Sequence, residues 1–227
     1  MHASVINFDG ISSIGLYIYA NDNFVLVGKE VPEKFDKELA EVFKVPIHRV
    51  TIAGTSMVGV FVAGNNSKIL VPGIIFDDEK DDLTKLGINF EVLDTRLTCL
   101  GNNLLVGSKV TLANPEFSDG QIKQIGEALN VSCEKALITD INTLGSLVVL
   151  NEHKKKALLT NDATDEDIAL IETKFEVEVT LGSVNMGSPY IRSGLVCNKN
   201  GFAVGSMSGG PEITNADDAL GFLEDDE

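Results

Sequence analysis

The feature that most constrains the fold is a glycine that recurs at nearly constant spacing along the chain. Each glycine of the series follows an apolar residue, and neighbouring members are 44, 42, 44 and 42 residues apart. The series consists of Gly15, Gly59, Gly101, Gly145 and Gly187. Because a fixed period of roughly 20–50 residues is typical of repeated structural units, the spacing predicts five copies of one unit.

The segments between the glycines support the repeat because they follow one order. Each glycine precedes a β-rich run such as residues 16–19, and a polar turn and a second apolar run follow, as in residues 21–27. An amphipathic helical pattern comes next, and a further strand such as residues 50–52 ends the unit. The predicted unit is therefore strand, strand, helix, strand. Capping sequences mark three of the expected helix starts: Ser118-x-x-Gln121, Thr164-x-x-Asp167 and Thr214-x-x-Asp217.

The fifth unit lacks its last strand, because the chain stops after a helical stretch around Leu220. The missing strand is present at the other end of the sequence, where residues 4–8 precede Gly15 at the offset of the third strands. Pairing of the two ends would close the array and leave no exposed end strands. We therefore expect one α/β domain over residues 1–223, a five-unit ring with helices outside and short strands around a central channel. Residues 224–227 form an acidic tail.

The charge of the chain restricts its partners. The net charge is −16, with 34 acidic and 18 basic residues, whereas nucleic-acid affinity comes mainly from cations that neutralise phosphates. The composition disfavours a DNA-binding or RNA-binding protein and favours a partner with a basic surface. The one dense basic run, Lys154 to Lys156, is read as a solvated hairpin tip in preference to an RNA-contacting patch.

The cysteines and the apolar runs indicate an intracellular, cytoplasmic protein. Cys99, Cys133 and Cys197 are widely spaced, which gives neither a disulfide framework nor a paired metal-binding motif. The first residues do not resemble a signal peptide, and no apolar run reaches the roughly 20 residues that span a bilayer. We expect a soluble monomer with no cofactor, no metal site and no membrane partner.

Three long stretches give the chain a recognisable resemblance. They are RLTCLGNN at residues 96–103, VGVFVAGNNSKILVPG at residues 58–73 and LGSVNMGSPYIRSGLVCN at residues 181–198. They come from three different units, and the chain resembles the translation initiation factor 6 family over nearly its whole length. The archaeal form fits best because the sequence ends soon after the fifth unit. Met186 and Arg192 depart from the expected pattern.

The resemblance implies both a fold and a function. The family's fold is the pentein, a five-bladed α-β propeller, in agreement with the repeat. Family members bind the large ribosomal subunit and prevent its association with the small subunit, and they take part in large-subunit maturation. By resemblance, the main partner is the universal large-subunit ribosomal protein number fourteen. A minor contact with ribosomal RNA near the sarcin-ricin loop is also implied.

The candidate ribosome-binding residues lie around the repeated joints. Asn102 is carried over from the Leu-Gly-Asn match, and Asn103 is its weaker neighbour. Equivalence between units adds seven further residues: Thr55, Ser56, Met57, Ser12, Ser13, Asn185 and Met186. The alternative for each is a turn residue that satisfies its own backbone.

An arginine-modifying enzyme of the pentein fold is the rival hypothesis. Such an enzyme resembles this ring and uses a cysteine nucleophile beside a histidine in the central channel. Cys99 lies near a channel-side joint, but no histidine occupies a matching position. His2, His48 and His153 all fall outside the segments expected to line the channel. We therefore predict no catalytic residues.

Overall fold

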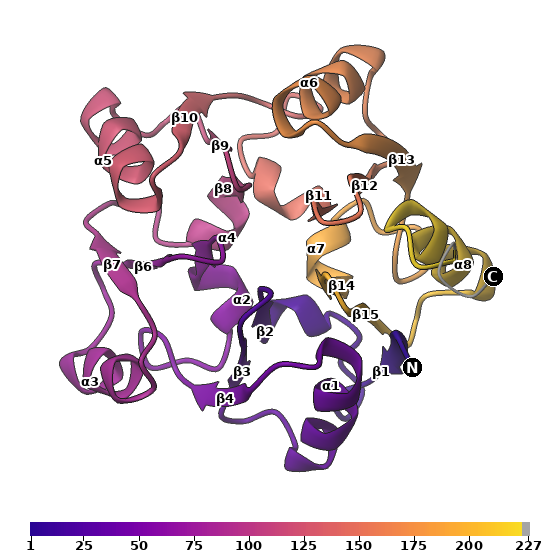
Figure 1. Ribbon diagram of the computed structural model, residues 1–227, viewed down its shortest axis with the longest axis horizontal. Helices are drawn as coiled ribbons and strands as arrows, with labels where there is room; N and C mark the ends of the chain where they lie inside the picture. Colours follow the sequence, from indigo (N-terminus) through magenta and orange to yellow (C-terminus); the bar gives the residue numbers. More distant parts are fainter. Residues whose placement is uncertain (224–227) are drawn as a thin grey trace.

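The computed structural model, which describes residues 1–223, is a ring of five three-stranded sheets. Figure 1 shows the sheets arranged about a central axis, with a longer helix outside each of them. Four sheets have the strand orders β2(Ile18–Ala20)-β3(Val25–Gly28)-β4(Ile47–Val50), β5(Ala63–Gly64)-β6(Ile69–Pro72)-β7(Phe90–Leu93), β8(Leu104–Val106)-β9(Val110–Ala113)-β10(Ser132–Lys135) and β11(Val148–Asn151)-β12(Lys156–Thr160)-β13(Glu178–Gly182). The fifth has the order β14(Leu195–Asn198)-β15(Gly201–Gly205)-β1(Ala3–Ile6). The expected pentein-type ring is confirmed.

The helices fall into an outer and an inner set (Figure 1). The outer helices are α1(Asp36–Phe43), preceded by η2(Glu33–Phe35), then α3(Asp77–Lys85), α5(Asp119–Leu129), α6(Asp165–Phe175) and α8(Gly210–Ala219). One-turn inner helices precede the first strands: η1(Ile14–Leu16), α2(Val58–Phe61), α4(Leu100–Asn103), η3(Leu144–Ser146) and α7(Ile191–Gly194).

Side-chain capping marks the start of two outer helices, α5 and α6. Ser118 and Thr164 are N-caps whose side chains accept a hydrogen bond from the backbone of Gln121 and Asp167, as the sequence predicts. The expected start at Thr214 is wrong. Helix α8 begins at Gly210, where Pro211 fits the first turn because a backbone N–H there has no helical partner.

Both ends of the chain meet in the fifth sheet. Strand β1 pairs in parallel with β15, in a register that places Val5 opposite Val204 and Ile6 opposite Gly205. The ring of His2 stacks on Phe222 with the centroids 5.6 Å apart. The predicted closure by the N-terminal strand is therefore confirmed.

The five inner helices begin with one backbone conformation. Their N-cap residues have φ between −78° and −88° and ψ between 49° and 73°: Ser13, Met57, Cys99, Thr143 and Tyr190. The expected joint at Met186-Gly187 is therefore wrong. Both residues lie in a turn that precedes α7, and Arg192 takes the place that glycine holds in the other four units.

Steric crowding explains the four glycines at these joints. A Cβ atom on Gly59 would lie 1.9 Å from the carbonyl oxygen of Gly15, and one on Gly101 would lie 2.2 Å from that of Gly59. A Cβ on Gly15 would meet the carbonyl oxygen of Arg192 at 1.8 Å. No side chain fits at such distances, so glycine sets how closely neighbouring units approach.

Neighbouring units share their hydrophobic cores. One cluster joins Ile6 and Ala203 of the fifth sheet to Val25 and Leu39 of the first unit. Another packs Leu105 of the third unit against residues of the fourth. Because each core needs two units, the loss of one strand exposes apolar surface in its neighbour as well.

Closure of the ring through β1 predicts that two adjacent residues of this strand contribute unequally to the free energy of unfolding. Ile6 is fully buried, whereas Val5 is 48% exposed on the same strand. Replacing Ile6 by Ala removes buried methyl groups and leaves a cavity, so we expect the free energy of unfolding to fall by about 2–5 kcal/mol. Urea unfolding followed by circular dichroism measures the loss.

Val5→Ala is the matched control, and we expect it to cost less than about 1 kcal/mol because its side chain is half solvated. Equal losses for the two variants would mean that β1 does not contribute a buried face to the fifth sheet.

Candidate functional site

The ring presents two different faces. The tip face carries the hairpin turns between first and second strands, near residues 21–24, 65–68, 107–109, 152–155 and 199–200. The turn face carries the inner helices and the loops that follow the second and third strands. Because second and third strands are parallel, their carboxyl ends lie at the same edge of each sheet.

Hydrogen bonds join the hairpins of the tip face to one another. The side-chain amide of Asn198 donates to the carbonyl of Asn21, whose own amide donates to the carbonyl of Asn65. Asn66 donates to the Asp22 carboxylate, which also accepts from a backbone N–H of the fifth unit. The polar groups of this face are largely paired within the ring.

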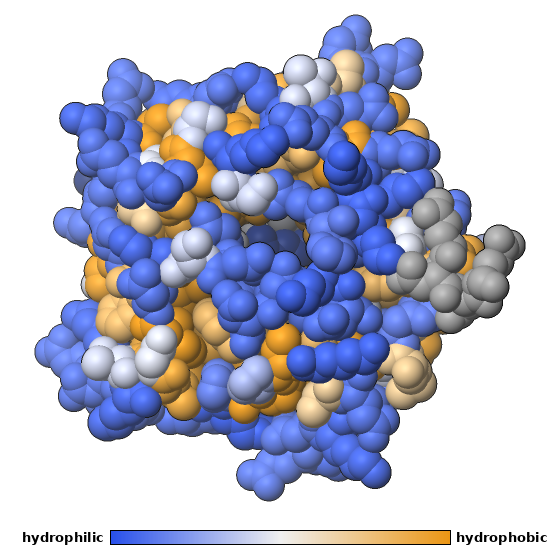
Figure 2. All heavy atoms as spheres, viewed as in Figure 1, coloured by the Kyte–Doolittle hydropathy of each residue, from blue (hydrophilic) through white to orange (hydrophobic). Residues whose placement is uncertain are grey.

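A central channel opens among these tips. Figure 2 shows a hollow at the centre of the ring, surrounded mainly by hydrophilic residues. The mouth is lined by tip residues that include Asn21, Asn65, Glu152 and His153. Deeper in, a cavity of about 110 Å³ is bordered by side chains of the first strands. The prediction that these short strands line a channel is confirmed.

Carboxylates from the outer helices hold the turns of the turn face. Glu79 of α3 is buried and accepts hydrogen bonds from the backbone N–H groups of Ala53, Gly54 and Phe76, at 2.7, 2.9 and 3.0 Å. Glu212 of α8 does the same for the turn at residues 185–187. These turns are therefore fixed in place.

These hydrogen bonds control the pKa of both carboxyl groups. Burial alone would raise the pKa of Glu79, but the backbone donors around it favour the charged form, and its pKa lies below the ordinary value. The pKa of Glu212 is lowered for the same reason. Both groups are charged at neutral pH.

The sequence-predicted contact residues all lie in the turns of the turn face or on the inner helices. Asn185 donates from its side chain to the carbonyl of Ser12 at 3.0 Å, which brings together candidates from the two ends of the chain. Met186 is 77% exposed in the same turn. Ser13 and Met57 are N-caps of two inner helices, and Thr55 accepts a hydrogen bond from the Met57 backbone. Asn102 is partly exposed on α4.

Three candidates are buried and bonded inside the ring. Asn103 donates to the Cys99 carbonyl and accepts from the Asn114 amide. The Ser56 hydroxyl accepts from the backbone of Glu30, and Ser12 lies against Ser206. The turn-residue alternative therefore describes Asn103, Ser56 and Ser12 better than a surface contact does.

The turn face also carries exposed apolar side chains that the sequence pattern does not single out. They are Ile11, Ile74, Phe76, Leu137, Tyr190 and Met207. Each lies in or beside a loop, outside the alternating pattern that marks a strand. An apolar residue in such a loop has no strand or helix face to bury it, and that was the signal available in the sequence.

The comparisons with known proteins agree with this architecture. The eIF-6 family model matches residues 3–219. This chain belongs to the eIF-6 family. A translation initiation factor 6 from Pyrococcus abyssi is 34% identical over 98% of this chain and 100% of its own length. One from Sulfolobus acidocaldarius is 35% identical over 90% of this chain and 92% of its own. The chain is therefore a member of a family of translation initiation factors.

A solved structure of C. jejuni agmatine deiminase is also similar, with 11% identity and a TM-score of 0.39. It covers 69% of this chain, and this chain covers 60% of it.

The thiol at the channel lacks the environment of a nucleophile. Cys197 borders both the inner cavity and the mouth, and burial raises the pKa of its thiol. A catalytic cysteine needs a lowered pKa and a histidine within hydrogen-bond reach. His153 does line the mouth, contrary to expectation, but its side chain is exposed at a hairpin tip. The Cys197 thiol donates to the Asn198 carbonyl instead.

Within residues 1–223, no helix is long and apolar enough to cross a membrane. In the same range, no three histidine, cysteine or acidic side chains gather as a metal site would require. The predicted acidic tail at residues 224–227 lies outside the described residues.

The carboxylate of Glu79 predicts a pH dependence of stability. Its pKa is lower in the folded chain than its ordinary value of 4.5, so its stabilising effect is complete above that value and is lost as pH falls through the folded-state pKa. We expect Glu79→Gln to lower the free energy of unfolding by about 1–3 kcal/mol at pH 7. The difference in the free energy of unfolding between wild type and variant should narrow as the pH falls below 4.5 and through the folded-state pKa of Glu79.

Urea unfolding at several pH values measures this gap. Asp81→Asn on the same helix is the control, because Asp81 is exposed, and we expect no comparable loss. A gap between wild type and Glu79→Gln that stays constant down to low pH would contradict the assigned role.

Proposed function

We propose that this chain binds the large ribosomal subunit through its turn face and prevents association with the small subunit. Membership of the eIF-6 family and relatives named translation initiation factor 6 support a role in translation. A bound ring blocks subunit joining by its bulk and needs no chemical step. Binding to the free large subunit also fits a part in large-subunit maturation in the cytoplasm.

The contrast between the two faces is the observation that carries this proposal. The tip face pairs its polar groups internally, as in the chain of bonds from Asn198 to Asn21 and Asn65. The turn face instead exposes large apolar side chains, including Met186, Tyr190 and others of the set above. Methionine and tyrosine are enriched in protein interfaces, so the turn face is the better docking surface.

The charge of the chain agrees with a ribosomal partner. An acidic protein is attracted to basic surfaces, and ribosomal proteins are mostly basic. The proposed main partner is large-subunit ribosomal protein number fourteen, with only a minor contact to ribosomal RNA. A monomeric ring can supply the roughly 800 Å² per partner of a standard interface.

The proposed contact residues are the exposed and half-exposed candidates of the turn face. Asn102 is the main polar contact, because its partly exposed side chain makes no hydrogen bond to another described residue. Asn185 and Met186 form a second contact beside α7. The others are Ser13, Thr55 and Met57.

Cosedimentation with purified ribosomal subunits tests the proposal. We expect the chain to pellet with large subunits in a one-to-one ratio and to stay in solution with small subunits. Its binding to large subunits should weaken as the salt concentration rises. Replacing both Met186 and Tyr190 by Ala should weaken large-subunit binding by about tenfold or more, because apolar contacts at an interface centre dominate affinity. Asn102→Ala should also weaken it.

His153→Ala on the tip face is the matched control and should leave binding unchanged. Circular dichroism verifies that each variant is folded. Absence of pelleting with large subunits would refute ribosome binding, whereas a loss of binding in His153→Ala alone would place the docking surface on the tip face.

A further inference from the structure

The central channel contains a cation, the Arg192 guanidinium, that forms no ion pair within the part of the chain that the structure describes. Arg192 borders the cavity from α7 and is largely, but not completely, buried. Its guanidinium donates to the carbonyl oxygens of Gly101 at 3.0 Å and Val62 at 3.4 Å, which belong to other units across the axis. Among residues 1–223, no carboxylate forms an ion pair with it.

A guanidinium has five N–H donors, so two carbonyl contacts leave part of its donor capacity unused. A buried charge is costly unless it is paired or hydrogen-bonded. Burial lowers the pKa of Arg192 for this reason. An arginine nevertheless stays protonated at neutral pH.

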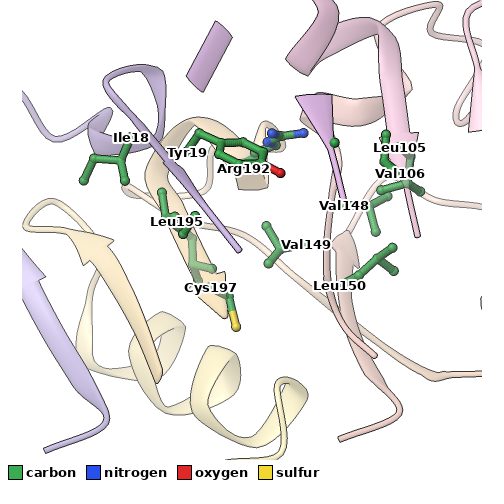
Figure 3. A pocket seen from close by; sticks show the side chains of 13 residues that line it. Ile18, Tyr19, Leu105, Val106, Val148, Val149, Leu150, Arg192, Leu195 and Cys197 are labelled. Atoms are coloured by element: carbon green, nitrogen blue, oxygen red, sulfur yellow. The ribbon is translucent and has the colours of Figure 1, made fainter. Parts of the chain in front are cut away.

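The hydroxyl of Tyr19 is a second unsatisfied group in the same cavity. Tyr19 is 4% exposed, and its hydroxyl forms no hydrogen bond with another of residues 1–223. Burial raises its pKa to about 12, so it is a neutral donor at pH 7. Tyr19 and Arg192 both line this cavity, and the charge of Arg192 partly offsets the rise in the pKa of Tyr19, as expected for neighbouring groups (Figure 3).

Most of the other side chains that border the cavity are apolar. Val149 and Leu195 border it near the two polar groups (Figure 3), and among residues 1–223 no carboxylate lines the inner cavity. Two carboxylates, Asp22 and Glu152, border the outer mouth, and both accept hydrogen bonds from neighbouring tips. Their charges oppose the entry of an anion, but neither residue lines the inner cavity itself.

We propose that the channel binds one small, singly charged inorganic anion between the Arg192 guanidinium and the Tyr19 hydroxyl. Both groups donate hydrogen bonds, and the anion satisfies the donor capacity that the carbonyls leave unused. A volume of about 110 Å³ accommodates an ion of the size of chloride, bromide or nitrate. The apolar walls disfavour a multiply charged anion such as phosphate, because its dehydration is more costly.

The bound anion would have a structural effect. Arg192 already connects the fifth unit to the second and third across the axis. The anion neutralises the charge of Arg192 and so stabilises this connection, although no side chain of residues 1–223 supplies a counter-charge. This inference is independent of ribosome binding, because the anion lies inside the ring.

Chloride NMR tests the site. We expect saturable broadening of the chloride line by the wild-type chain, and its loss in Arg192→Met. Tyr19→Phe keeps the ring packing and removes only the hydroxyl, so it should fold and weaken chloride binding by about tenfold or more. Arg96→Met removes an exposed arginine instead and should bind chloride as wild type does.

Bromide-soaked crystals locate the ion, and we expect one anomalous peak between Arg192 and Tyr19. Absence of both broadening and peak in the wild type would mean that the channel holds water only, and this would overturn the proposal. Unchanged chloride binding in Tyr19→Phe, or displacement of chloride by equimolar phosphate, would also overturn it. If Arg192→Met does not fold, the chloride binding of the Tyr19→Phe variant decides whether the proposal holds.

Discussion

The parallel pairing of β1 with β15 is the interaction on which the rest of the structure depends. It joins the first residues of the chain to the last sheet, in the register of Val5 with Val204. Without it, the fifth sheet would expose an edge and the shared core around Ile6 would open. With it, five similar units form a closed ring in which the five inner helices begin with the same backbone conformation, and glycine occupies the equivalent position in four of them.

Closure forces the inner helices together, and this explains both the glycines and the exception to them. Backbone carbonyls of one joint approach the next too closely for a Cβ atom, as at Gly59. In the fifth unit the bridged turn before α7, Val184 to Ser188, is one residue longer than its equivalents such as Ile52 to Thr55, and a side chain is accepted at Arg192. The Arg192 side chain reaches across the channel and donates hydrogen bonds to the carbonyl oxygens of Gly101 and Val62. A rigid ring with an enclosed axis and two dissimilar faces results.

Much of this fold could be predicted because the repeat is visible in the sequence. The unit order, the closing strand and the channel-lining strands all follow from glycine spacing and apolar periodicity. The fifth joint was misplaced because Gly187 falls near the expected spacing, while the true equivalent is an arginine. The burial of Asn103 and Ser56 could not be predicted, since their partners Asn114 and Glu30 are set by tertiary contacts. The exposed apolar residues of the loops could likewise not be predicted from apolar periodicity, because they lie outside strands and helices.

Hydrogen–deuterium exchange with and without large ribosomal subunits tests most directly the claim that a closed ring docks by its turn face. Amides of loops near Ile11, Thr55, Asn102 and Met186 should become protected on binding, while those of the hairpin tips keep their exchange rates. Protection confined to the tips around Asn66 and Glu152, with the turn face unchanged, would contradict the account.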